Sequence, residues 1–161
     1  MTTIYKLTDQ NMQTHNGYQW ALGETRTASG EGGLCGPGFL HGYTDPLLAV
    51  LLNPIHANIT NPRLFRGEGT VAKTDHGLKI GCTEMTLTEE MEPPAINTVQ
   101  RVAFGILCAK EINKDEAWGK WADDWLSGKD RTEAAWAAWA AAWEAADIDL
   151  IAIAHKAMEA T

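Results

Sequence analysis

Side chains able to do chemistry gather in one glycine-rich segment near the middle of the chain. Residues 34–46 have the sequence LCGPGFLHGYTDP and carry Cys35, His41 and Tyr43. A thiol, an imidazole and a phenol are groups that act in nucleophilic or general acid–base catalysis. The alternative interpretation is a structural turn that delivers Phe39 and Tyr43 to the core.

From the residues alone, we take His41 and Tyr43 as candidate catalytic residues. Two glutamates lie on later expected strands, Glu68 at residues 63–71 and Glu84 at residues 78–88. The favoured interpretation of the acidic run that includes Glu84 is a solvated rim, which is typical of clustered carboxylates.

The motifs of common cofactor and metal sites do not occur in the sequence. It contains neither G-x-G-x-x-G nor G-x-x-x-x-G-K-[ST], so no standard nucleotide loop is predicted. A metal site could be drawn from Cys35, His41, His56 and Cys82, but no C-x2-C or H-E-x-x-H spacing supports it. The sequence therefore predicts no metal and no bound cofactor.

Six of the seven tryptophans occur in two alanine-rich segments with the same W-x2-W-x3-W spacing. At about 100° per residue, each triplet falls on one face of a helix. Together six such rings can bury roughly 900–1500 Å², more than the largest apolar patch of a typical monomer. They are candidate binding residues for a partner protein or a second copy, or they pack within the chain itself: Trp118, Trp121, Trp125, Trp136, Trp139 and Trp143.

Periodicity predicts an α+β fold with a small mixed or antiparallel sheet. Strands are expected at residues 4–7, 18–22, 63–71 and 78–88, with a hairpin turn between the last two. Asp45 and Pro46 are typical of a helix start, and Asn53-Pro54 should end or kink that helix. Residues 98–109 favour a helix, although a buried strand is the alternative for their end.

The composition changes near residue 113, which predicts two parts. Residues 1–113 form the expected α+β body, and residues 114–161 form a Trp/Ala-rich helical hairpin and a C-terminal helix packed on it. The first hairpin helix covers residues 115–126 and the second begins at Asp130, which caps it with Glu133 in a capping-box pattern.

Charge and cysteine content exclude several classes of function. The net charge of −8 argues against direct nucleic-acid binding, because phosphate contacts need clustered Lys and Arg. No apolar run approaches the ~18 residues of a membrane span, and the first residues do not resemble a signal peptide. Three scattered cysteines do not suggest a disulfide framework. We therefore expect a cytoplasmic protein, or one in the host cytoplasm if phage-encoded.

Three motifs resemble a family of small proteins encoded by phages and prophages. They are LCGPGFLHGYTDPLLAVLL, RLFRGEG and GLKIGC, and the resemblance covers roughly residues 4 to 112. Members show a cysteine, a G-F-H-like turn, a short helix and a glycine-containing strand. This sequence differs by inserting Leu40 between Phe39 and His41. The resemblance implies a viral or mobile-element origin and no particular activity.

The order of elements is also similar to that of ADP-ribosyltransferases: a first strand with Tyr5-Lys6, a glycine-rich crossing with His41 and Tyr43, and a later strand with Glu68 or Glu84. Those folds use a polar residue on an early strand, an aromatic or hydroxyl residue in the middle and a late glutamate to handle a dinucleotide. The resemblance therefore adds Glu68 and Glu84 to the candidate catalytic residues. We therefore carry two hypotheses. The first is a phage-type accessory protein that acts by macromolecular binding in host interaction, defence inhibition or virion assembly. The second is a small enzyme that handles a nucleotide or NAD.

Overall fold

The computed structural model describes residues 1–129, 131 and 148–161. The chain separates into two compact units, Met1–Pro94 and Ala95–Thr161. The fold is α+β, as the sequence predicts, with an antiparallel sheet in the first unit and helices in the second. The division expected between residues 113 and 114 stays a prediction; helix α2 (Thr98–Ile112), which precedes that point, belongs to the second unit.

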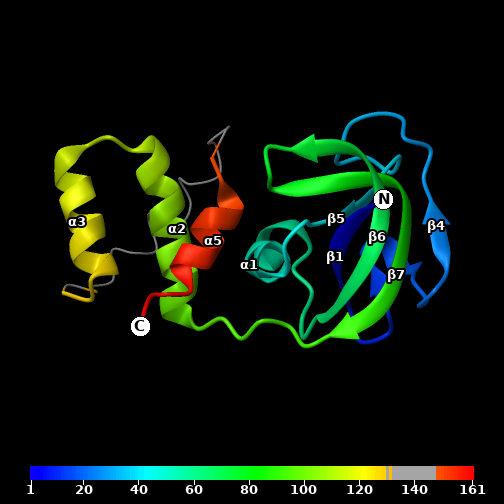
Figure 1. The fold of residues 1–161 in the computed structure, drawn as a ribbon, viewed down its shortest axis with the longest axis horizontal. Helices are drawn as coiled ribbons and strands as arrows, with labels where there is room; N and C mark the ends of the chain where they lie inside the picture. The colour runs from blue at the N-terminus through cyan, green and yellow to red at the C-terminus, as the bar shows by residue number, and fades with distance from the viewer. Residues whose placement is uncertain (130, 132–147) are drawn as a thin grey trace. The chain divides into compact units, whose positions relative to one another are not determined.

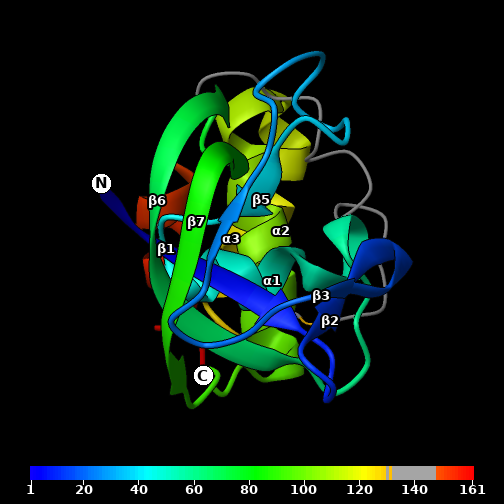
Figure 2. The same cartoon turned by 90° about the vertical axis from the view of Figure 1, so that its right-hand side faces the viewer.

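The first unit is organised around a five-stranded antiparallel sheet (Figure 1). Its two long strands form the predicted hairpin and run side by side along their length (Figure 2). The order along the sheet is β1-β6-β7-β4, and β5 pairs with β7 beside β4. The strands are β1 (Thr2–Thr8), β4 (Thr25–Thr27), β5 (Leu40–Gly42), β6 (Arg63–Asp75) and β7 (Lys79–Met91).

The strands β1, β6, β7 and β5 form a closed ring of contacts. Besides its pairing with β7, β5 is followed at once by Tyr43, which pairs with Tyr5 of β1 in an isolated antiparallel bridge. Tyr5 N donates to Tyr43 O at 2.8 Å, and Tyr43 N donates to Tyr5 O at 2.9 Å. This closure places the middle of β1 directly beside β5.

Alternation along β1 sends its side chains to two different clusters. Ile4 packs with Trp20, Phe65 and other buried residues on one side of the strand. Leu7 packs on the other side with Ala49 of α1 (Pro46–His56). Since Lys6 is two residues from Ile4, the pleat directs it towards the same side as Ile4.

Helix α1 starts as the sequence predicts. The Asp45 carboxylate accepts hydrogen bonds from Leu47 N at 2.8 Å and Leu48 N at 3.4 Å, and Pro46 occupies the first turn. The helix continues through Pro54 to His56. Its last turn matters for the site, because it carries His56.

A second small sheet and a long loop complete the first unit. The expected strand at residues 18–22 is reduced to β3 (Tyr18–Gln19), which pairs with β2 (Gln13–Thr14) around the short helix η1 (His15–Gly17). The glycine-rich loop folds back on itself, with Gly30 N donating to Gly38 O at 2.8 Å. A Cβ at Gly38 would lie 2.0 Å from Glu31 O, so only glycine fits this crossing.

Three helices are described in the second unit: α2, α3 (Glu116–Leu126) and α5 (Leu150–Ala157). Residues 98–112 form one continuous helix, and Asn97 and Gln100 form a capping box at its start. Helix α2 packs against both α5 and α3. Asp115 caps α3, which ends before Gly128 with its φ of +79°, as predicted. The predicted helix beginning at Asp130 lies outside the described residues.

Within the described part of the chain, every helix is too short or too polar to cross a bilayer.

Gly67 provides a test of the curved β6–β7 pairing. The register shifts between Arg66 and Gly67, and a Cβ at Gly67 would lie 2.2 Å from Thr86 O. We expect Gly67→Ala to lower the free energy of unfolding by about 1–3 kcal/mol, because neighbouring backbone must move. Chemical denaturation measures this loss. Gly33→Ala is the matched control, since nothing lies within 4 Å of its added Cβ. Equal stability of the two variants would contradict the close approach.

Candidate functional site

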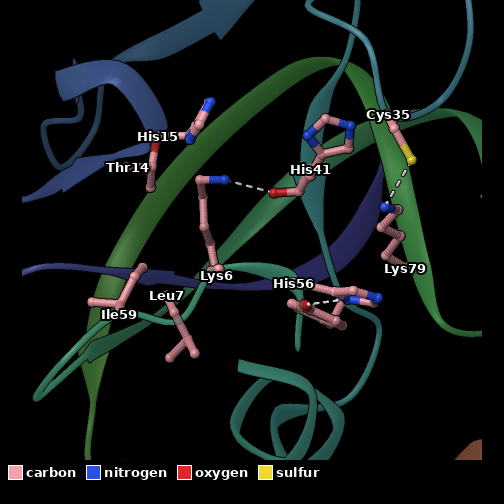
Figure 3. Close-up of a pocket in the computed structure, with 11 residues that line it drawn as sticks. Lys6, Leu7, Thr14, His15, Cys35, His41, His56, Ile59 and Lys79 are labelled. Atoms are coloured by element: carbon pink, nitrogen blue, oxygen red, sulfur yellow. Dashed lines mark hydrogen bonds between the residues drawn. The ribbon is translucent and has the colours of Figure 1, made fainter. Parts of the chain in front are cut away.

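A cleft in the first unit collects residues from β1, β5, η1, α1 and the glycine-rich loop (Figure 3). It has two adjoining compartments with volumes of about 390 Å³ and 520 Å³. Both compartments are lined by Lys6, Thr14, His15, Cys35 and His41. The smaller also has Leu7, Tyr43, His56, Ala57, Ile59 and Lys79, and the larger has Asn16, Tyr18, Trp20, Gly36, Pro37, Phe39 and Leu40.

Lys6 lies where the two compartments meet. Its side chain is buried, with 8% of the residue exposed. The amine donates to the backbone oxygen of His41 at 2.6 Å and lies 4.6 Å from the centre of the Trp20 ring. No carboxylate in the described residues forms an ion pair with it. Burial therefore lowers the pKa of Lys6 from 10.5 to about 8.

The imidazole of His41 is fixed by the glycine-rich loop. Its Nε2 is hydrogen bonded to the carbonyl oxygen of Leu34. A carbonyl only accepts, so Nε2 carries the proton and the neutral ring keeps its lone pair on Nδ1. Partial burial lowers the pKa of His41, and the positive charges of Lys6 and Lys79 lower it further, against the effect of the Leu34 hydrogen bond. The ring is therefore mostly neutral at pH 7 and has a basic nitrogen.

Tyr43 and His56 form a second pair in the smaller compartment. The phenol oxygen lies 2.9 Å from His56 Nδ1, and the two rings are nearly parallel. Burial raises the pKa of Tyr43, while burial and then the charge of Lys79 lower that of His56. Both groups are neutral near pH 7. A hydrogen bond between them links the end of α1 to the residue that closes the strand ring.

At the rim of the smaller compartment, Lys79 Nζ lies 3.1 Å from Cys35 Sγ (Figure 3). Cys35 is exposed, whereas Cys82 and Cys108 are buried. The rim therefore presents a second lysine to the cleft and holds it against the loop that also anchors His41.

The charge of the cleft is opposite to that of the protein. Two lysines and three of the five histidines line it, and none of its described lining residues is Asp or Glu. The first unit nevertheless has ten acidic residues against six Lys and Arg. The acidic side chains are therefore segregated away from this cleft.

The structure brings together two of the four candidate catalytic residues. His41 and Tyr43 line the smaller compartment. Glu68 and Glu84 are exposed on β6 and β7, and neither lines the cleft. Glu84 instead accepts from Thr70 Oγ1 across the hairpin at 3.3 Å. The reason is alternation: Gly67 and Gly69 are buried, so Glu68 between them projects to the opposite side.

The sequence interpretation assigned neither His15 nor Lys79 to a functional site. Lys6 entered it only as part of the early strand that resembles ADP-ribosyltransferases, and His56 only in a metal set that no motif spacing supports. One signal was available for Lys6. Lys6 is two residues from Ile4 and therefore falls on the same side of the expected strand as this apolar residue. A lysine in that position is unusual, because lysine is almost never fully buried without a partner. The other three come from distant segments, and only the folded chain places them around one cavity.

The structure describes only the first of the two rows of candidate binding tryptophans. Trp125 is buried, whereas Trp118 and Trp121 are half-buried and contact each other, with ring centres 5.8 Å apart. Arg131 lies over the Trp125 ring at 5.1 Å. The second row lies outside the described residues: Trp136, Trp139 and Trp143. Their role in binding stays a prediction.

No group of three or more His, Cys, Asp or Glu side chains within residues 1–129, 131 and 148–161 is arranged to hold a metal ion.

Comparison with protein families gives one match. The family described as Domain of unknown function (DUF7666) matches residues 2–98, which is more than half of the chain. The chain belongs to this family. All the residues that line the cleft, from Lys6 to Lys79, lie within the DUF7666 match. Comparisons with curated proteins and with solved structures found no match.

The buried amine of Lys6 predicts a pH-dependent stability difference. The folded-state pKa of about 8 lies below the ordinary 10.5, so burial of the charged form costs stability fully below pH 8. That cost disappears as the pH rises through 10.5. We expect the stability of Lys6→Met relative to wild type to fall by about 2–3 kcal/mol between pH 7 and pH 10.

Denaturant unfolding at both pH values measures the difference. Lys120→Met removes an exposed lysine of the second unit and controls for the loss of one positive charge. A stability difference between Lys6→Met and wild type that is the same at pH 7 and pH 10 would show that the Lys6 amine is solvated in the folded protein.

Proposed function

We propose that the DUF7666 unit binds a small anionic ligand of the nucleotide class in the Lys6–His41 cleft. The observation that carries the proposal is the buried amine of Lys6 at the floor of a cavity whose described lining has no carboxylate. A buried charge normally has a partner of opposite sign. An anionic ligand would bring the missing negative charge into the cavity that Lys6 and Lys79 line.

The size and chemistry of the lining support a ligand larger than a free anion. Compartments of about 390 Å³ and 520 Å³ fall in the range of roughly 300–1,000 Å³ that drug-sized ligands occupy. Trp20 and Phe39 contribute buried aromatic rings to the lining of the larger compartment, and Tyr18, which is exposed, has surface on which a nucleobase can stack. Lys79 and His56 add cationic or hydrogen-bonding groups to the smaller one. This division suits a ligand with a planar end and an anionic end.

The cleft also supports acid–base chemistry on such a ligand. His41 has its proton fixed on Nε2 by Leu34, which leaves Nδ1 free to accept a proton. The resemblance to ADP-ribosyltransferases implied a late glutamate, but Glu68 and Glu84 do not line the cleft. We therefore base the proposal on the lysines and imidazoles and leave a glutamate out of it.

The macromolecular-binding hypothesis concerns a different part of the chain. Half-buried Trp118 and Trp121 on α3 are compatible with a partner surface in the second unit. A phage or prophage origin, and a role in host interaction, defence inhibition or virion assembly, stay predictions from the resemblance. The cleft has the more specific observation in its favour.

Calorimetric titration with AMP, NAD and ADP-ribose tests the proposal. We expect at least one of these anions to bind, and uncharged adenosine to bind at least about tenfold more weakly than AMP, since hydrogen bonds to charged groups contribute roughly 1.5–3 kcal/mol. Lys79→Ala should weaken binding by about tenfold for the same reason.

Arg66→Ala is the matched control. Arg66 is exposed, pairs with Glu89 and does not line the cleft, so the variant removes one positive charge from the same unit. Its affinity should equal that of wild type. The proposal fails if no anion binds, or if adenosine and AMP bind equally well.

A further inference from the structure

We propose that Lys6 acts as an amine nucleophile that forms a Schiff base with an aldehyde or ketone group of the ligand in the cleft. This inference rests on the proposed function and adds a covalent step to it. The ligand class it specifies is a phosphate-bearing carbonyl compound, such as a nucleotide-linked sugar with a free anomeric carbon.

The position of the amine supports this role. Lys6 Nζ lies where the two compartments meet and faces the cavity lined by His41 and His15 (Figure 3). Its hydrogen bond to the backbone oxygen of His41 fixes the end of a flexible side chain. The indole face of Trp20 limits movement on another side. The amine is thereby held at the junction of the two compartments that Lys6 lines.

The surroundings also favour the reactive, unprotonated form. The titratable groups facing Lys6 are His41 on β5, His15 on η1 and Cys82 on β7. Burial raises the pKa of Cys82 to about 11, so its thiol is neutral at pH 7.5. Burial has a larger effect on the pKa of Lys6 than Cys82, which acts in the opposite direction. With a pKa of about 8, Lys6 has an unprotonated fraction at pH 7.5 that exceeds that of an ordinary lysine by about two orders of magnitude.

The chemical step is balanced without an oxidant or a metal. The Nζ lone pair attacks the carbonyl carbon, the carbonyl electron pair moves to oxygen, and one N–H proton transfers from the nitrogen to that oxygen to give a neutral carbinolamine. The carbinolamine then loses water, and its nitrogen loses its last N–H proton when the C=N bond is complete. A basic nitrogen such as His41 Nδ1 can accept a proton within the cleft, and solvent can accept it at the rim.

Lys79 gives the ligand a second contact of different kind. Its ammonium lies at the rim beside Cys35 rather than on the floor. An anionic group on the ligand can therefore pair with Lys79 while the carbonyl carbon reaches Lys6. This separation of roles distinguishes the cleft from a simple anion-binding pocket.

The test uses pyridoxal 5′-phosphate as the probe, because it combines a phosphate, a planar ring and an aldehyde. Sodium cyanoborohydride delivers hydride to the C=N bond and makes the adduct permanent. Peptide mass spectrometry of the full chain then locates the label. We expect the probe to modify Lys6 at least about tenfold faster than exposed Lys120 at pH 7.5, because more of its amine is unprotonated.

Pyridoxine 5′-phosphate is the matched control, since it has the same phosphate and ring but an alcohol in place of the aldehyde. It should bind the cleft by calorimetry, compete with labelling of Lys6 and leave no covalent mass. Lys6→Met should lose the fast label, whereas Lys120→Met should retain it. Site mapping in the wild-type chain keeps the test valid even if Lys6→Met does not fold.

The outcomes separate the two proposals. Fast labelling confined to Lys6 supports the Schiff base. Binding of pyridoxine 5′-phosphate without preferred labelling of Lys6 overturns the Schiff base and leaves the anion-binding cleft standing. Uniform labelling of lysines together with no binding of pyridoxine 5′-phosphate, AMP, NAD or ADP-ribose overturns both.

Discussion

The paired backbone hydrogen bonds between Tyr5 and Tyr43 are the constraint on which the site depends. They join β1 to the residue that follows β5 and so close the ring of strands. Without this closure, Lys6 and His41 would lie on separate edges, because β1 and β5 are not neighbours through the β6–β7 hairpin. With this closure, the amine of Lys6 donates a hydrogen bond to the backbone oxygen of His41, and both residues line the cleft.

The same closure buries the amine of Lys6. The unit that contains it has a net negative charge. Burying an ammonium without a carboxylate is unfavourable, and it is seen in the lowered pKa of Lys6. Natural proteins retain a destabilising group when it has a function, and active-site residues often lower the free energy of unfolding for that reason. Under the proposed function, the buried lysine, the neutral imidazoles and the segregated carboxylates form one environment that suits an anionic, reactive ligand.

The glycines have a structural part in this environment. Gly38 permits the loop to cross itself at Glu31, and Gly81 leaves room for Leu34 and Phe39, whose atoms lie 2.5–3.1 Å from an added Cβ. The loop can then deliver Cys35 to the rim and the carbonyl of Leu34 to His41. The chemistry-bearing residues and the glycines in this segment thus have distinct functions: the glycines shape the loop, and the loop fixes the imidazole.

Local signals were sufficient for most of the secondary structure. The hairpin of β6 and β7, the aspartate cap of α1 and the start and end of α3 follow from turn residues, capping and periodicity, which act within a few positions of the chain. Periodicity left the end of α2 undecided, since alternating apolar residues there also suit a strand. The structure shows that α2 continues to Ile112, and the capping box at Asn97 marks only its start.

The sequence by itself predicted the α+β class, the aspartate cap of α1 and the end of α3, because these depend on neighbours in the chain. It also supplied His41 and Tyr43 as candidates, and both line the cleft. Only the tertiary structure decided that Glu68 and Glu84 face away and that Lys6, His56 and Lys79 converge with His41. The physical reason is that the side on which a strand residue projects, and the segments that meet it, are set by register and ring closure between distant strands. Those long-range pairings leave no periodic signal in the sequence.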